Sequence, residues 1–194
     1  MLFSVIFHEF AHALTCRQLG LGTGTITLTA VGGYFVPVSI DQLPFQLERA
    51  QRLRFAATSA AGPLSTLLLA GILALVAQAT HSAFAATIAR LNLSLAALNL
   101  LPIPPLDGGS IVMSLSSLYV DWRLLYRLQG ALCMLLAAAD IWRTNATAAG
   151  QHHYAGLFLV FGFSAFAASF RSEAVLLEKW QQGVRAERRL VQEV

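Results

Sequence analysis

Long runs without charged residues dominate the hydrophobic pattern of this chain. Residues 55–89 and 144–170 contain no Asp, Glu, Lys or Arg. A helix that crosses the hydrocarbon core of a bilayer needs about 20 mostly apolar residues, and both runs are long enough. Each run is therefore predicted to hold a membrane span.

Three further segments are apolar but interrupted. Residues 1–20 carry ionisable side chains in their middle, residues 86–118 are broken by prolines, and residues 124–142 end beside Arg143. Residues 1–20 lack the basic start of a signal peptide, which argues against a cleaved leader. The pattern predicts an all-α polytopic membrane protein with about five transmembrane helices, of which the segment 86–118 is discontinuous.

Two segments follow other patterns. Polar and apolar residues alternate from Thr25 to Ala30, and Gly32-Gly33 permits a tight turn before Tyr34. This pattern predicts a small β-hairpin over residues 25–38, lying at the membrane interface. Residues 171–194 mix apolar and charged side chains, which favours an interfacial or cytoplasmic helix.

Composition excludes several classes of protein. The 194 residues are 56% hydrophobic and 12% charged, with a mean hydropathy of +0.62, whereas soluble domains carry about 25% charged residues. A soluble enzyme and a nucleic-acid binder are therefore excluded, and the lipid bilayer is the expected partner. Eleven of the thirteen Lys and Arg residues fall on one side of the five predicted spans. The positive-inside rule then places the C-terminus in the cytoplasm.

The first predicted span contains His8, Glu9 and His12 within five residues. Residues i and i+4 share one face of a helix, so both imidazoles can point at one zinc ion, while Glu9 is placed to act on water at the metal. The alternative is a pair of histidines satisfied by neighbouring polar groups. In that alternative, no metal ion offsets the free-energy cost of burying three ionisable groups in lipid.

A catalytic zinc usually has three protein ligands, so a further ligand is expected at membrane depth. Asp107 follows the proline-rich break 99–106 in an otherwise apolar region. Irregular backbone is tolerated in a membrane where it lines a protein cavity. Asp107 is therefore the predicted third ligand. The alternative is that Asp107 caps a helix, and both roles can coexist.

The motif from His8 to His12, followed by the Asn99–Gly109 segment NLLPIPPLDGG, resembles the site-2 protease family of intramembrane zinc metalloproteases. Gly32-Gly33 and Gly62-Pro63 are similar to two further features of that family. The resemblance covers roughly residues 1–118. It implies that His8, His12 and Asp107 bind one Zn²⁺, that Glu9 is catalytic, and that Asn99 holds the substrate backbone or the developing oxyanion.

The expected function is hydrolysis of peptide bonds in or near transmembrane segments of membrane-anchored proteins. The expected organisation is a catalytic membrane core over 1–118, two accessory transmembrane helices over 119–170 and a helical tail over 171–194. The expected location is a bacterial cytoplasmic membrane, because the chain is rich in Arg and Ala and has one Lys. The alternatives are a catalytically silent membrane scaffold of the same fold and a membrane metal transporter or sensor.

The hairpin has its own expected role. An extended substrate can be held by strand addition to a free sheet edge, and Gly32, Gly33 and Tyr34 are the candidate edge residues. Pro37 would limit pairing near the end of that strand. The alternative is a hairpin that only fills the loop.

Overall fold

The structure is a computed structural model that describes residues 2–29, 32–37, 46–146, 155–171 and 173–192. Helices make up most of this part of the chain, with one small antiparallel sheet. The elements are α1 (Leu2–Gln18), β1 (Gly24–Thr29), β2 (Gly32–Pro37), α2 (Arg49–Thr80), α3 (Ala83–Asn99), α4 (Asp107–Ser116), α5 (Trp122–Ala146), α6 (Ala155–Ala168) and α7 (Glu173–Gln192).

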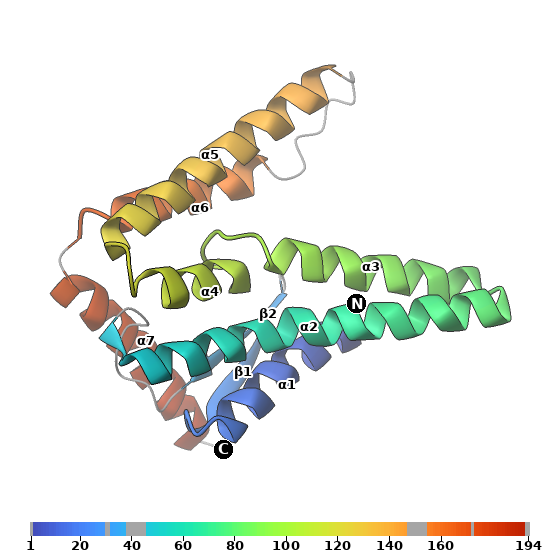
Figure 1. The fold of residues 1–194 in the computed structure, drawn as a ribbon, viewed down its shortest axis with the longest axis horizontal. Helices are drawn as coiled ribbons and strands as arrows, with labels where there is room; N and C mark the ends of the chain where they lie inside the picture. The colour runs from blue at the N-terminus through green and yellow to red at the C-terminus, as the bar shows by residue number, and fades with distance from the viewer. Residues whose placement is uncertain (1, 30–31, 38–45, 147–154, 172, 193–194) are drawn as a thin grey trace.

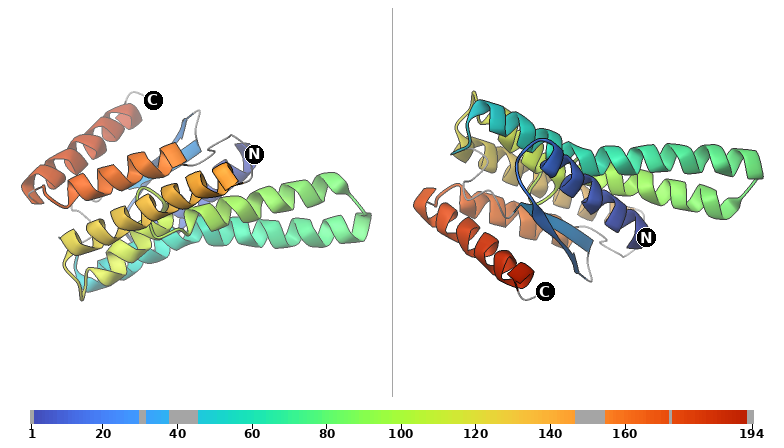
Figure 2. Two further views of the ribbon diagram at one scale, coloured as in Figure 1. Left: turned by 90° about the horizontal axis from the view of Figure 1, so that it is seen from above. Right: turned by 90° about the horizontal axis from the view of Figure 1, so that it is seen from below.

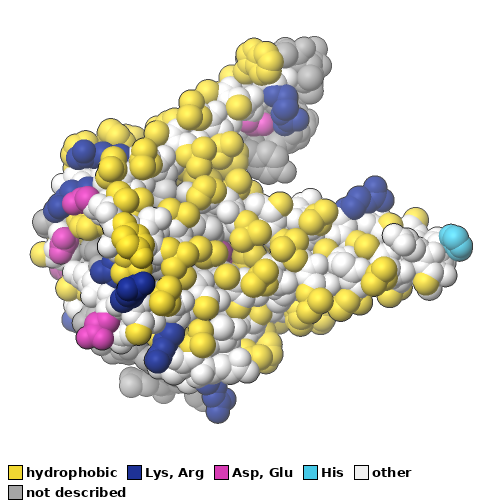
Figure 3. Space-filling view, viewed as in Figure 1, with side chains coloured by type: hydrophobic (Ala, Val, Ile, Leu, Met, Phe, Trp, Pro, Cys, Tyr) yellow, Lys and Arg dark blue, Asp and Glu magenta, His cyan; other side chains and the backbone are white. Residues whose placement is uncertain are grey.

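Two helical hairpins define the shape of the molecule. Helices α2 and α3 lie side by side as one long hairpin, and α5 and α6 form a second hairpin that diverges from the first (Figure 1). Helix α4 lies between them and follows α3 along the chain. The two hairpins are separated by an open notch in the space-filling view (Figure 3). This arrangement leaves room for a cavity at the junction of the two hairpins.

The hairpin of α2 and α3 sets the limits of the first charge-free run. The run 55–89 was predicted to hold a span, and α2 fills it as far as Thr80, where the chain reverses at His81, whose φ is 52°. Ser82 then begins α3, because its side chain accepts a hydrogen bond from the Ala85 backbone N–H at 3.2 Å. The turn is built from uncharged polar residues, so absence of charge did not mark it. The run 144–170 is likewise longer than α6, which covers Ala155–Ala168.

The predicted break in the helical segment 86–118 is confirmed. Helix α3 ends at Asn99 and α4 begins at Asp107, with non-helical backbone between them. A Cβ atom at Gly108 would collide with the backbone oxygens of Leu100 and Leu101, and one at Gly109 would lie 2.5 Å from the Ile103 carbonyl carbon. The two glycines therefore allow α4 to pack directly on the loop that precedes it.

The predicted β-hairpin is also confirmed, but Gly32 and Gly33, which were expected to form its turn, lie in β2 and pair with Thr29 and Leu28. Strands β1 and β2 are antiparallel, with Thr25 opposite Val36 and Thr27 opposite Tyr34. Helix α1 lies between the sheet and α2, and α7 runs on the far side of the sheet (Figure 2). The tail is helical as predicted, over Glu173–Gln192.

Two of the described helices are long and apolar enough to cross a bilayer, namely Arg49–Thr80 and Trp122–Arg143, and Phe158–Ala168 is a shorter apolar helix. The number of five spans stays a prediction. Lys and Arg side chains gather at the end of the molecule where α2 and α5 begin (Figure 3). That gathering is the asymmetry on which the predicted orientation rests.

Candidate metal centre

His8 and His12 lie one turn apart on the buried face of α1. Each is 4% exposed, and their ring centroids are 4.8 Å apart at an interplanar angle of 79°. The opposite face of α1 carries Phe3 and Phe10, which are exposed by 69% and 55%. The helix thus turns its two imidazoles inward and its aromatic side chains outward, as the i and i+4 spacing predicts.

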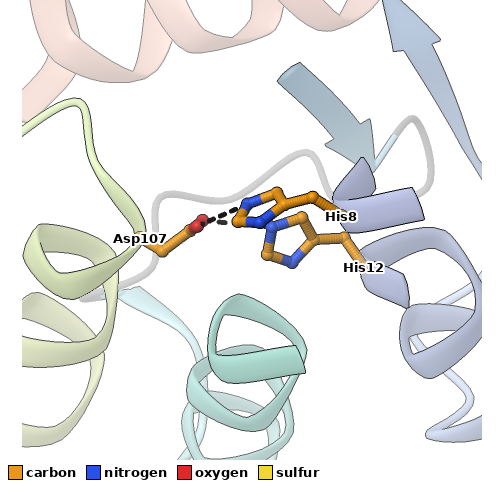
Figure 4. Close-up of side chains that lie close together, drawn as sticks. All are labelled: His8, His12 and Asp107. Carbon is orange, nitrogen blue, oxygen red and sulfur yellow. Dashed lines mark hydrogen bonds and ion pairs between the residues drawn. The ribbon is translucent and has the colours of Figure 1, made fainter. Parts of the chain in front are cut away.

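Asp107 comes to these histidines from a distant part of the chain. Its Oδ2 lies 3.0 Å from His8 Nε2, and its Oδ1 lies 3.3 Å from His12 Nε2 (Figure 4). Asp107 is the first residue of α4, and Leu106 occupies the N-cap position. The alternative in which Asp107 itself caps the helix is therefore wrong. The carboxylate instead faces both imidazoles across the cavity.

The donor set fits a zinc ion. One ligand atom from each of His8, His12 and Asp107 lies within 4.8 Å of the others. Ligand atoms at about 2.0–2.2 Å from a tetrahedral zinc are roughly 3.3–3.5 Å apart, which is close to the separations of the carboxylate oxygens from the two Nε2 atoms. Two imidazole nitrogens and one carboxylate are also the ligand types that catalytic zinc sites use.

The hydrogen bonds around the histidines bear on which nitrogen is available. His12 Nδ1 lies 2.7 Å from the backbone oxygen of Thr58. A carbonyl oxygen only accepts, so Nδ1 carries the proton and Nε2 keeps its lone pair for a metal. His8 Nδ1 is buried and has no hydrogen-bond partner among the residues that the structure describes.

Glu9 occupies the same buried region. It is 4% exposed, and β2 crosses directly over it. A Cβ atom at Gly33 would lie 2.9 Å from Glu9 Cγ and 3.2 Å from Glu9 Oε1. Gly33 and Tyr34 line the central cavity, whereas Gly32 is not among the described lining residues. Gly32 instead pairs with Thr29 at the end of the sheet.

Helix α2 supplies two features that the sequence did not assign. The Thr58 carbonyl orients His12, and Gly62 faces the imidazoles so closely that a Cβ atom there would lie 2.6 Å from His8 Nε2. The Gly62-Pro63 resemblance marked this helix but not its steric role. A backbone carbonyl leaves no trace in the residue type, so Thr58 could not have been found from the sequence.

Asn99 lines the central cavity from the C-terminal end of α3. Its Nδ2 donates to the Leu95 backbone oxygen at 3.0 Å, within its own helix. The structure therefore brings Asn99 to the cavity with one of its amide protons already bonded. Its contact with a substrate stays a prediction.

The central cavity has a volume of about 730 Å³. Besides the polar residues above, it is lined mainly by apolar side chains, and α5 and α6 contribute Tyr126, Gln129 and Phe161. An apolar cavity with a few convergent polar groups is the usual form of a ligand or active site. Here the convergent groups are the two imidazoles of His8 and His12 and the two carboxylates of Glu9 and Asp107.

Known proteins are similar to this chain in sequence and in fold. The family model described as Peptidase family M50 matches residues 74–136. Rip3 of Mycobacterium tuberculosis, a candidate zinc metalloprotease, is 33% identical over 120 residues, which are 58% of this chain and 28% of that protein. Zinc metalloprotease MJ0392 of Methanocaldococcus jannaschii is 30% identical over 119 residues, which are 59% of this chain and 32% of that protein. The chain thus matches less than a third of the length of these relatives.

A solved structure supports the fold. The site-2 protease from Methanocaldococcus jannaschii superposes with a TM-score of 0.55 at 20% identity, covering 86% of this chain and 72% of that one. Both relatives have zinc metalloprotease in their names, MJ0392 outright and Rip3 as a candidate. The chain is similar to Peptidase family M50 over residues 74–136 and to a site-2 protease in its fold, in line with the resemblance that its motifs carry.

Proposed function

We propose that this chain is an intramembrane zinc endopeptidase that hydrolyses peptide bonds in or near transmembrane segments of membrane-anchored proteins. The observation that carries the proposal is the approach of Asp107 to His8 and His12, at 3.0 and 3.3 Å. These side chains come from two helices whose ligands are 99 positions apart. Two imidazoles and a carboxylate that converge in this way form a ligand set that a divalent cation can satisfy at once.

In this proposal His8 Nε2, His12 Nε2 and the Asp107 carboxylate hold the zinc ion. When bound, zinc polarises the scissile carbonyl and makes water nucleophilic at neutral pH. Glu9 accepts a proton from the attacking water, whose oxygen bonds to the carbonyl carbon. As the carbon–nitrogen bond breaks, Glu9 delivers that proton to the leaving amine. The products are a carboxylic acid and an amine, and Glu9 returns to its starting state.

Two further groups of the protein are proposed to contact the substrate. Asn99 can turn its amide from Leu95 and donate to the carbonyl oxygen as negative charge develops. The edge of β2 beside Gly33 and Tyr34 can pair with an extended segment of substrate. A transmembrane helix must unwind locally before it can offer such a segment, because its peptide groups are otherwise bonded within the helix.

The proposed location is the cytoplasmic membrane of a bacterium, with the C-terminus in the cytoplasm. The gathering of Lys and Arg at one end of the molecule supports this orientation (Figure 3). The apolar faces of α2 and α5 support insertion, since exposed leucines such as Leu68 (64%) and Leu135 (67%) would face lipid.

The test is Glu9→Gln in the purified full chain, assayed with tagged single-span reporter proteins in lipid vesicles. We expect this variant to bind zinc like the wild type and to lose cleavage, because the amide cannot accept the proton. Glu178→Gln is the matched control, since Glu178 is an exposed residue of α7. Cleavage by Glu9→Gln at the wild-type rate would disprove the assignment. A scaffold would cleave nothing as wild type, and a transporter would move metal in both forms.

A further inference from the structure

Gln129 is a buried polar side chain on a helix that otherwise resembles a lipid-facing span. It is 4% exposed, whereas its neighbours Leu124 and Leu128 are exposed by 47% and 56%. Removing an amide from water is unfavourable unless the amide finds a hydrogen-bond partner. The hydrogen-bond partner of Gln129 therefore indicates what this amide does in the fold.

That partner is the backbone of the helix that carries Asp107. Gln129 Nε2 donates to the Gly109 backbone oxygen at 3.2 Å, and the bond is buried. Gly109 lies two residues after Asp107, in the first turn of α4. Gln129 and Gly109 also both line the central cavity. The hydrogen bond thus joins an accessory helix to the turn that positions the carboxylate.

Helix α5 divides its contacts between two faces. Toward α6 it presents Gly130, where a Cβ atom would lie 3.0 Å from the Gly162 backbone oxygen. Toward the cavity it presents Tyr126 and Gln129. The close packing of α5 on α6 therefore does not need the Gln129 amide. The amide serves the contact with α4 instead.

The start of α4 needs such a restraint. The seven residues before Asp107 form no helix, and the N-cap residue Leu106 has no side chain that can bond the first turn. Asp107 must nevertheless stay within 3.0–3.3 Å of two imidazoles on another helix. The hydrogen bond from Gln129 to the Gly109 carbonyl ties the first turn of α4 to α5.

We infer that Gln129 is a positioning residue for Asp107, acting through the Gly109 carbonyl to hold the carboxylate in register with His8 and His12. The inference rests on the metal centre of the proposed function. It assigns to α5 a part in the geometry of the site, in addition to lining the cavity. Groups that hydrogen-bond the ligands themselves typically change metal affinity by about 10- to 100-fold when they are removed. Gln129 acts through the backbone two residues from Asp107, so we expect an effect at the lower end of that range.

The experiment measures zinc affinity by competition with a coloured chelator, using the full chain purified in detergent. Gln129→Met removes the donor at similar volume, and Gln129→Asn keeps the amide but shortens its reach by one methylene. Asn92→Ala is the matched control. Asn92 is a buried amide (1% exposed) whose Nδ2 donates to Ile88 in its own helix, so its loss should affect folding without affecting the zinc site.

We expect both Gln129 variants to bind zinc about 10-fold more weakly than the wild type, and Asn92→Ala to bind it within about twofold. Equal zinc affinity in the wild type and in a folded Gln129 variant would overturn the inference. Zinc binding is measured without a substrate, so this outcome is independent of cleavage. The Gln129 variants could bind zinc more weakly than the wild type, as predicted, while the wild type cleaves no reporter. That result would overturn the proposed function and leave the positioning role in place.

Discussion

Gly62 on α2 lies directly against the His12 imidazole on α1, with no space for a side chain between them. A Cβ atom built at Gly62 would overlap His12 Nε2 and lie 2.6 Å from His8 Nε2. Both nitrogens are the atoms that face Asp107. The glycine therefore allows two helices to approach closely at the point where the metal ligands converge.

Gly62→Ala is expected to abolish or strongly weaken zinc binding, because the added methyl group must displace one or both imidazoles. The measurement is zinc content after purification and chelator competition. Gly71→Ala on the same helix is the control, since a Cβ atom there meets nothing within 4 Å. That control should keep zinc and gain up to about 1 kcal/mol of helix stability. Normal zinc affinity in Gly62→Ala would show that the helices separate easily at this point.

Asp107→Asn tests the third ligand. The amide keeps the shape of the side chain but loses its negative charge, so zinc affinity is expected to fall by at least about 10-fold, with a matching loss of cleavage. Asp121→Asn is the control. Asp121 accepts a hydrogen bond from the Arg123 backbone N–H at 2.7 Å at the start of α5, and Asn caps a helix about as well as Asp. Unchanged zinc affinity in Asp107→Asn would remove Asp107 from the ligand set.

The sequence was most informative where a physical requirement fixes the residue type. The HExxH spacing put His8 and His12 on one face of a helix, and the position of Asp107 in an apolar region after a proline-rich break marked it as their partner. The ends of the helices were harder to predict from the sequence. The absence of charge does not distinguish a polar turn such as Thr80–Ser82 from the helices on either side of it, so the charge-free run 55–89 extends past the end of α2 into α3.

Features that depend on tertiary contact were not predictable. Gly62 and Gly33 are required for space, and the atoms that need this space belong to α1. The Thr58 contribution is a backbone carbonyl, which any residue would supply. Gln129 was recognisable as a polar residue in an apolar run, for which an interhelical hydrogen bond is the plain expectation. Its bond to the turn after Asp107 depends on how α5 packs and became visible only in the structure.

Asp140 is expected to matter for stability and not for the metal. It is 7% exposed and accepts a hydrogen bond from the Ala155 backbone N–H at 3.0 Å, where α6 begins. Asp140→Ala should lower the free energy of unfolding by about 1–3 kcal/mol, because a buried N–H loses its acceptor. Arg143→Ala should cost less than about 1 kcal/mol, since the side chain of Arg143 is 62% exposed. Thermal unfolding in detergent measures both, and a larger effect of Arg143→Ala would contradict the assignment.

Gly33→Ala tests the role of Glu9 in proton transfer independently of zinc binding by the metal ligands. The new Cβ would lie 2.9 Å from Glu9 Cγ and 3.0 Å from Val5 Cγ1, and neither atom belongs to His8, His12 or Asp107. The Glu9 carboxylate should therefore shift while the ligands stay in place. We expect wild-type zinc affinity and a fall in kcat of at least about 10-fold, because a small displacement of a catalytic group is costly. Gly62→Ala provides the contrast, since it should lose zinc and cleavage together. Loss of zinc in Gly33→Ala would mean that β2 supports the whole centre, and full activity would mean that β2 can move away from Glu9 without consequence for the reaction.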